Sequence, residues 1–207
     1  VNGLPLLAYT IKYALSEKNV DRVIVSTDSK VIQKIAKKHG AECPFLRPRS
    51  LSKSKISDKP VLAHAAKWLE ENENYYPDIL IYLRPTVLLR KKGLISKCVN
   101  KLISTNCTSL RTIREVGHWH PYWMVKLDKK NIIKEFLKDK NVEKYYQSQL
   151  LPKIYKHDGY VDIVLRKNLP SQFHTGDNLK DFYGKKIYGF INEDKHFINI
   201  DNYNELE

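Results

Sequence analysis

The amino-acid sequence predicts an α/β fold built on a doubly wound, mostly parallel sheet with helices on both faces. Two short runs, one β-branched at residues 20–25 and one fully apolar at residues 79–83, have the composition of buried strands. Amphipathic helical patterns alternate with these runs at residues 4–15, 31–36 and 94–103. Apolar strands joined by crossover helices are typical of a parallel sheet that is covered on both faces. Because such sheets bind ligands at the carboxyl ends of their strands, a functional site is expected in the loops that follow them.

Each predicted helix has its own local signals. Residues 4–15 carry apolar side chains at helical spacing, with Pro5 in the first turn, where a proline is tolerated. Residues 31–36 place apolar side chains on one face and lysines lie on the other, and Gly40 follows as a stop signal. Residues 60–69 are also predicted to be helical, so helices and strands alternate up to the strand ILIYL.

The alternation ends between residues 109 and 165, where strand-like stretches take over. The sequence DKKN at residues 128–131 is a turn between MVKL and IIKEFL, which indicates an antiparallel excursion. We therefore predict one domain over residues 1–207 with an inserted arm at about residues 116–155. The arm is rich in Trp and Tyr, which buried interfaces favour, so we expect a homodimer contact there; alternatively, these rings pack onto their own domain.

The composition indicates a folded protein with a bias toward anionic partners. Its 207 residues include 36 Lys and Arg against 23 Asp and Glu, a net charge of +13 at pH 7. This excess favours nucleotides, nucleic acid or acidic sugars without choosing among them. No apolar run approaches the roughly 20 residues of a membrane span, so no membrane association is expected and the cytoplasm is the predicted location.

Several common catalytic and metal-binding signatures are missing from the sequence. It contains no Walker loop, G-x-G-x-x-G, H-E-x-x-H or G-x-S-x-G, which excludes the usual ATPase, dehydrogenase, zinc-protease and esterase motifs. Cys43, Cys98 and Cys107 form no C-x-x-C pair and are predicted to be reduced core thiols. The only methionine is Met124, so Val1 is not an ordinary translation start and the natural chain is expected to begin upstream.

Three segments that follow or contain strands carry side chains suited to binding. Asp28 follows the first strand, where the N-cap of the next helix is a better interpretation than catalysis. Arg84 ends an apolar strand, where it either meets an anionic ligand or forms a structural salt bridge. Asn199 and Asp201 share one strand face, and their oxygens suit a hard cation such as Mg²⁺; a solvated strand face is the alternative.

Two further polar segments are candidates for binding. Arg47 begins a basic loop, and because its forked donors match a phosphate group, phosphate capture is one hypothesis and a solvated loop the other. His118 and His120 lie beside Trp119 and Trp123 but have no third metal ligand at usable spacing. A loop packed by aromatic side chains is therefore favoured over a metal site.

Six segments, taken in order, carry a family resemblance: NGLPLLAYTI, DRVIVSTDSKVIQKIAKKHGAE, FLRPRSLS, ILIYLRPTVLLR, QLLPKIYKHDGY and FINIDNYNEL. Each segment is a weak signal by itself, but together they cover nearly the whole chain. In this order they resemble the acylneuraminate cytidylyltransferase family, the CMP-sialic acid synthetases and relatives that activate other nonulosonic acids.

The resemblance implies a nucleotidyltransferase that joins CTP to a 2-keto-3-deoxy acidic sugar with Mg²⁺, giving a CMP-sugar and pyrophosphate. The implied partners are CTP, an acidic sugar and a second copy of the chain, held through the inserted arm, rather than nucleic acid. The implied site residues are Arg47, Arg84, Thr86 and Asp28 for the nucleotide, Lys156, His157, Asp158 and Gly159 for the sugar, and Asn199 and Asp201 for the metal and for catalysis.

Several positions depart from the motifs of the family. Its first strand and its basic phosphate loop would lie before Val1 and are missing from the sequence. Arg84 replaces a substrate-contacting glutamine, Asp158 replaces the Asn of an N-G pair, and Asn199 replaces the first Asp of a D-x-D motif. An amide is a poorer Mg²⁺ ligand than a carboxylate. Two alternatives therefore stay open: a catalytically degenerate binding or dimerising module of the same fold, or a cytidylyltransferase for another acidic sugar such as 3-deoxy-manno-octulosonate.

Overall fold

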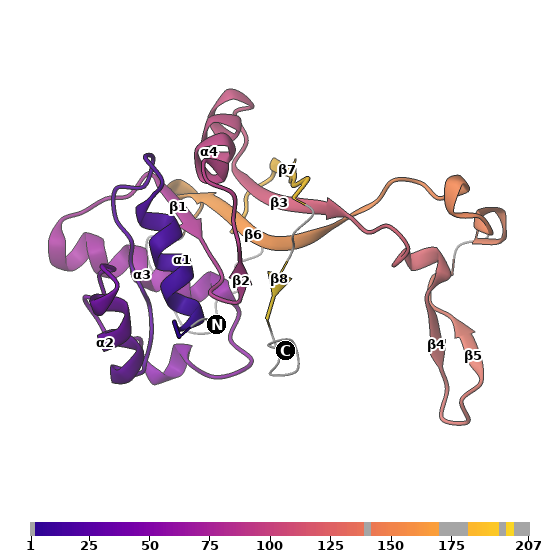
Figure 1. Ribbon diagram of the computed structural model, residues 1–207, viewed down its shortest axis with the longest axis horizontal. Helices are drawn as coiled ribbons and strands as arrows, with labels where there is room; N and C mark the ends of the chain where they lie inside the picture. Colours follow the sequence, from indigo (N-terminus) through magenta and orange to yellow (C-terminus); the bar gives the residue numbers. More distant parts are fainter. Residues whose placement is uncertain (1–2, 139–141, 170–181, 195–197, 201–207) are drawn as a thin grey trace. The chain divides into compact units, whose positions relative to one another are not determined.

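The computed structural model of the protein describes residues 3–138, 142–169, 182–194 and 198–200 (Figure 1). The chain forms two compact units, one made of Val1–Thr112 with Gly159–Glu207 and the other of Ile113–Asp158. We call them the sheet unit and the arm unit. The sheet unit combines helices with a four-stranded sheet, so the α/β class predicted from the sequence is confirmed.

The helices of the sheet unit lie where the apolar periodicity predicts them. They are α1 (Leu6–Leu15), α2 (Lys30–Lys38), α3 (Asp58–Glu73) and α4 (Leu94–Ser104), with short 3₁₀ turns at η1 (Arg49–Leu51) and η5 (Arg166–Asn168). Pro5 precedes the first helical residue of α1, where its missing N–H leaves no hydrogen bond unmade.

The N-cap of α2 corrects one expectation from the sequence. Ser29, and not Asp28, is the capping residue, and its Oγ accepts a hydrogen bond from the Ile32 N–H over 3.4 Å. A cap must stand directly before the first helical residue, with extended backbone, for its oxygen to reach these N–H groups. Asp28 lies one position too early, so its carboxylate is left for another contact.

Four strands form the main sheet, in the order β1, β6, β3, β7. β1 runs antiparallel to β6, and the register pairs Ile79 with Leu165 and Tyr82 with Asp162. The apolar run at residues 20–25 contributes one isolated parallel bridge between Ile24 and Glu42 instead of a full strand. The strand bounds are β1 (Ile79–Tyr82), β2 (Val87–Leu88), β3 (Ser109–Glu115), β6 (Tyr155–Leu165), β7 (Ile187–Ile191) and β8 (Ile198–Asn199).

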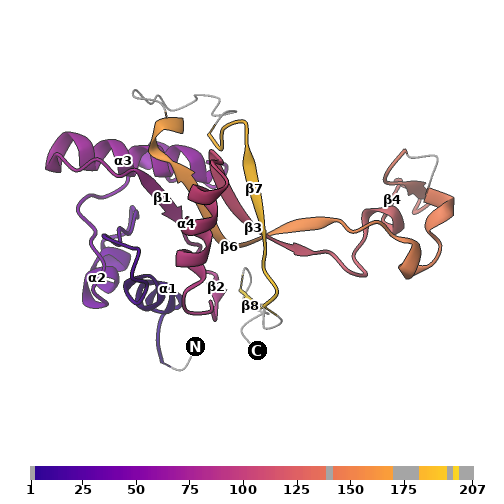
Figure 2. The same ribbon diagram turned by 90° about the horizontal axis from the view of Figure 1, so that it is seen from above.

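Both faces of the central strand β6 are packed. On one face Ile163 belongs to a core cluster with Ile95 and Cys98 of α4, and on the other its neighbour Val164 packs with Ala66 of α3. Successive side chains of a strand point to opposite faces, which explains why adjacent residues join different clusters. Figure 2 shows α3, α4 and these strands from above. Burial of each such aliphatic side chain contributes roughly 1.5–3 kcal/mol.

The three cysteines are buried free thiols, as the sequence predicts. Cys98 lies in the α4 cluster, and Cys43 packs in a second cluster with Ile11 and Ala36. Among the helices in the described ranges, none is both long enough and apolar enough to cross a bilayer.

The arm unit contains a hairpin and several short turns. β4 (Val125–Leu127) pairs antiparallel with β5 (Ile133–Glu135), and the predicted turn between them is confirmed. Asp128 closes that turn, because its Oδ1 accepts from the Lys130 and Ile132 N–H groups over 2.9 and 3.0 Å. The turns are η2 (Pro121–Trp123), η3 (Val142–Tyr145) and η4 (Ser148–Leu150).

Aromatic packing within the arm explains His120. Its Nδ1 accepts from the Tyr122 N–H, and its Nε2 lies 3.2 Å from the Pro152 oxygen, so both ring nitrogens have protein partners. Tyr122 stacks on Tyr145 with ring centroids 4.7 Å apart. The aromatic packing that the sequence favours for this loop is therefore present around His120. Not all of the arm's rings pack this way, since Trp119 is 77% exposed in the chain.

Candidate functional site

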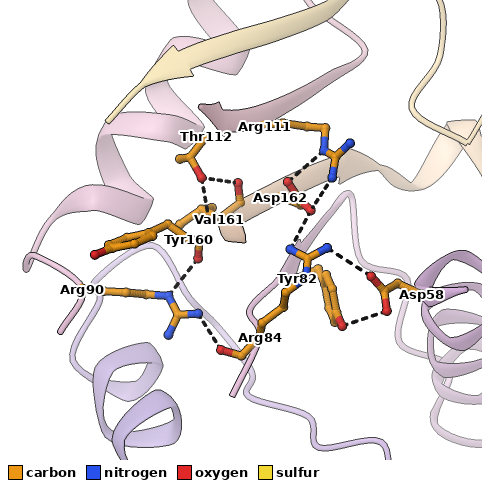
Figure 3. A network of polar contacts seen from close by, with 9 residues as sticks. All are labelled: Asp58, Tyr82, Arg84, Arg90, Arg111, Thr112, Tyr160, Val161 and Asp162. Carbon is orange, nitrogen blue, oxygen red and sulfur yellow. Dashed lines mark hydrogen bonds and ion pairs between the residues drawn. The ribbon is translucent and has the colours of Figure 1, made fainter. Parts of the chain in front are cut away.

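Arg84 lies just beyond the end of β1 and is held by two carboxylates (Figure 3). Its Nη1 donates to Asp162 Oδ2 over 3.0 Å, and its Nη2 donates to Asp58 Oδ2 over 3.1 Å. Asp162 comes from the neighbouring strand β6, and Asp58 is the first residue of α3. Sheet register and the start of a helix thus bring both partners to the strand end, where the salt bridge expected as one alternative is formed.

Asp162 is the centre of a larger polar network. It is 2% exposed, and it also accepts from Nε and Nη2 of Arg111 on β3, over 3.0 and 3.1 Å. A buried carboxylate needs such partners, because an unpaired charge is costly to remove from water. The Tyr82 hydroxyl donates to Asp58 Oδ1 over 3.0 Å and completes the network.

The network shifts the protonation of its members. Burial, followed by the negative charge of Asp58, raises the pKa of Tyr82, so the phenol stays protonated and remains a donor. Burial opposes the charge on Arg84, but the charge of Asp162 and the hydrogen bond to it outweigh that effect and raise the pKa of the guanidinium. Tyr82 and Arg84 therefore both act as hydrogen-bond donors near neutral pH.

Arg90, at the other end of the same loop, is fully engaged with backbone and side-chain oxygens. Its Nε donates to the Tyr160 oxygen over 2.8 Å, and its Nη1 donates to the Val87 oxygen over 2.7 Å and to Thr10 Oγ1 over 3.2 Å. Its Nη2 donates to the main-chain oxygen of Arg84 over 2.7 Å. Arg90 is buried, so it fixes the loop that carries Arg84 against α1 and β6.

Gly159 allows Arg84 to pass close to β6. Its φ is +72°, which side-chain-bearing residues rarely adopt, and a Cβ there would lie 3.3 Å from Arg84 Cδ. The predicted sugar-site residue Gly159 therefore contacts the predicted nucleotide-site residue Arg84. The remaining predicted sugar residues belong to the arm unit, where Lys156 and His157 are exposed and Asp158 is buried.

Arg47 and Asp28, both predicted to bind the nucleotide, lie together. Arg47 Nη2 is 3.8 Å from Asp28 Oδ1, while its Nε donates to Ser52 Oγ and its Nη1 to the Ser26 oxygen, over 3.1 and 3.3 Å. The Arg47 N–H also donates to the Thr27 oxygen over 2.8 Å. Arg47 thus links the loop at residues 26–28 to the basic loop that begins at residue 47.

The predicted metal strand is joined to the loop that follows β1. β8 pairs antiparallel with β2, with Asn199 opposite Val87, and the Ile200 N–H donates to the Thr86 oxygen over 2.9 Å. Asp201, the second predicted metal ligand, lies outside the described residues. Within the described ranges no group of three or more His, Cys, Asp or Glu side chains could hold a metal ion. One amide oxygen from Asn199 does not by itself make a Mg²⁺ site.

Sequence reasoning missed four members of the network: Asp58, Tyr82, Arg111 and Asp162. Asp162 had a usable signal, because a carboxylate inside the apolar run YVDIVL must find a cationic partner when the strand is buried. Asp58 and Arg111 carry no comparable signal, since each looks like an ordinary polar residue in its own segment.

A family model described as Cytidylyltransferase matches residues 1–198 of the chain. The pseudaminic acid cytidylyltransferase of Campylobacter jejuni subsp. jejuni serotype O:2 is 33% identical over 101 residues, covering 49% of this chain and 43% of that protein. The N-acylneuraminate cytidylyltransferase of Escherichia coli O18:K1:H7 is 28% identical over 204 residues, covering 98% of this chain and 44% of that protein. The chain thus spans less than half the length of either relative.

A solved structure shows the same fold. The 4-diphosphocytidyl-2C-methyl-D-erythritol synthase of Anaerococcus prevotii superposes with a TM-score of 0.61 at 14% identity, covering 100% of this chain and 87% of that one. At this identity the likeness concerns the fold alone, and it agrees with the α/β architecture of the sheet unit.

Proposed function

We infer that this chain, which belongs to the cytidylyltransferase family, is a cytoplasmic nucleotidyltransferase that activates an acidic nonulosonic sugar with CTP. The observation that carries the proposal is the match of the family model to residues 1–198, nearly the whole chain. The names of the two curated relatives, which specify pseudaminic and N-acylneuraminic acid, support an acidic nonulosonic sugar as the substrate class. The net charge of +13 also suits two anionic substrates.

In the proposed reaction a hydroxyl of the sugar attacks the α-phosphorus of CTP. A new P–O bond forms to the sugar, the bond from the α-phosphorus to the bridging oxygen breaks, and pyrophosphate leaves while the hydroxyl proton passes to solvent. The chain's part is to position two anions and to offset their charge, as in other phosphoryl transfers.

We assign the nucleotide contacts to the strand-end loops of the sheet unit. Arg47, beside Asp28, is proposed to bind the phosphates of CTP, since its fork is paired mainly with uncharged oxygens. Thr86 and Arg84 are proposed to face the nucleotide or the sugar from the loop after β1. Lys156, His157, Asp158 and Gly159 are proposed for the sugar.

Magnesium is the proposed cofactor, with Asp201 as its carboxylate ligand and Asn199 beside it. A bound Mg²⁺ would offset the charge of the phosphates during transfer. The attachment of β8 to the loop containing Thr86 supports this assignment, because it holds the metal strand at the loop that follows β1.

We further propose that the protein is a homodimer formed through the arm unit. Its hairpin leaves apolar side chains exposed in the single chain, notably Leu127 and Ile133, and Trp119 is the most exposed of its rings. Contiguous apolar surface of this kind is typical of an interface. A second copy that covered it would bring Lys156 and His157 to a composite active site.

Incubation of the purified protein with CTP, Mg²⁺ and a panel of nonulosonic acids tests the proposed function. Pyrophosphate release that requires one of the acids is the expected result, with 3-deoxy-manno-octulosonate included as the competing substrate. If CTP binds and no acid is turned over, the chain is instead the catalytically degenerate binding module. The replacement of a metal-binding Asp by Asn199 would be consistent with that result.

A further inference from the structure

Arg84 belongs to a charge-balanced group. Arg84 and Arg111 contribute two positive charges, and Asp58 and Asp162 contribute two negative charges, linked in a chain of hydrogen bonds that runs from Asp58 through Arg84 and Asp162 to Arg111 (Figure 3). An approaching anion would meet the guanidinium and, immediately behind it, two carboxylates. The Asp58 side chain is 46% exposed, so its repulsion is felt from solvent as well.

Arg84 nevertheless keeps hydrogen-bond donors to offer. A guanidinium has five N–H groups, and the bonds to Asp58 and Asp162 use two of them. The other three find no acceptor among the residues that the structure describes. The side chain is 26% exposed and lies over the Tyr82 ring, with Cζ 4.8 Å from the ring centroid, so its plane is fixed before any ligand arrives.

Arg47 provides the contrast within the same unit. It also follows an apolar run, but its hydrogen bonds go to the uncharged Ser52 hydroxyl and Ser26 oxygen. Within the described ranges the one carboxylate near its guanidinium belongs to Asp28, which lies 3.8 Å away and is half exposed. Arg47 therefore keeps most of its attraction for an anion, whereas the charge of Arg84 is already offset.

We propose that Arg84 is a specificity-determining residue that donates hydrogen bonds to an uncharged oxygen of the sugar, such as an acylamido carbonyl or a hydroxyl, and not to its carboxylate or to the phosphates of CTP. This inference rests on the proposed function and specifies the kind of group that is recognised. Donors that a bound sugar covers, and that then find no acceptor on it, discriminate strongly between substrates, which gives the residue a selective role.

The test compares Arg84→Ala, Arg84→Gln and Arg47→Ala, with Lys67→Gln as a control that removes one surface charge from α3. CTP dissociation constants are measured by calorimetry, and kcat/KM is measured for two nonulosonic acids that differ only by an acylamido group in place of a hydroxyl. Each is repeated at about 50 and 300 mM salt, because screening weakens contacts between charges.

Arg84→Ala should leave the CTP dissociation constant within about twofold and change the ratio of kcat/KM between the two acids about tenfold. That change should be the same at both salt concentrations, and Arg84→Gln should recover part of it. Arg47→Ala should instead weaken CTP binding by about tenfold or more at low salt and less at high salt.

A loss of CTP affinity in Arg84→Ala that matches Arg47→Ala would overturn the inference, as would an equal, salt-dependent loss for both acids. Failure of the proposed function looks different: the unsubstituted protein would turn over no acid at all. In that case CTP binding still decides whether Arg84 contacts an anion, because that measurement needs no turnover.

Discussion

Arg90 donates a hydrogen bond from its Nη2 to the main-chain oxygen of Arg84, so one buried arginine sets the backbone from which the other extends. The two residues come from one loop and have opposite surroundings. Arg90 is buried and bonded to neutral oxygens, whereas Arg84 is paired with carboxylates and partly open to solvent. The first is a structural clamp, and the second is available to a ligand.

Arg90→Lys is expected to destabilise the protein by about 2–4 kcal/mol, because a single ammonium group cannot replace a fork that reaches Tyr160, Val87 and Arg84, and buried oxygens are left without donors. Urea unfolding measures the change. Arg49→Lys, at an exposed position of η1, is the matched control and should stay within about 0.5 kcal/mol. If both variants lower the free energy of unfolding equally, Arg90 does not stabilise the loop in the way described.

His64 should make stability depend on pH. Burial, and then the charge of Arg47, lowers its pKa below the ordinary value of 6.5, so below that pH the unfolded chain binds protons more strongly than the folded one. Its contribution is therefore complete above pH 6.5 and is lost progressively as the pH falls through that value toward the lowered pKa. Thermal unfolding between pH 7.5 and 5 should show a drop in Tm that is smaller in His64→Gln. A drop of the same size in both proteins would assign it to other groups.

The proposed metal ligands predict opposite effects for two substitutions. Asp201→Ala should abolish transfer, and Asn199→Asp should lower the Mg²⁺ concentration that gives half-maximal rate, because it adds a charged oxygen ligand. Pyrophosphate release titrated with Mg²⁺ measures both. Full activity of Asp201→Ala would end the assignment.

The proposed dimer predicts that Ile133→Lys shifts the protein toward a monomer, because an exposed apolar residue at an interface would become a buried, unpaired charge. Light scattering at micromolar concentration gives the mass. Lys130→Glu in the neighbouring turn is the control and should leave the dimer intact. An unsubstituted protein that is monomeric under these conditions contradicts both the dimer and the composite site.

The helices were predictable from sequence because their signals are local. The apolar spacing at residues 94–103 matches α4 (Leu94–Ser104) closely, and residues 60–69 fall inside α3, which extends further at both ends. The correction at Ser29 is also local: two adjacent residues can both cap a helix, and only the backbone conformation decides between them.

The environment of Arg84 could not be predicted in the same way. Its partners Asp58 and Asp162 lie 26 and 78 residues away, and their approach depends on the register of β1 with β6 and on where α3 begins. From the sequence alone, an anionic ligand and a salt bridge were therefore equally plausible partners for Arg84. The structure contains the salt bridge and leaves donors beside it, which makes the two alternatives compatible.

The short pairing of β2 with β8 determines which part of the folded molecule opens most readily. Only two residue pairs and the hydrogen bond from the Ile200 N–H to the Thr86 oxygen hold the two strands together. The strands are more than 100 residues apart in the sequence, so these few bonds must offset the entropy lost on closing a long loop. Such a junction opens by local unfolding well before the sheet does. The amide of Ile200 should then exchange with deuterium much faster than those of Val161 and Ile163, and any ligand that bridges the junction would slow it selectively.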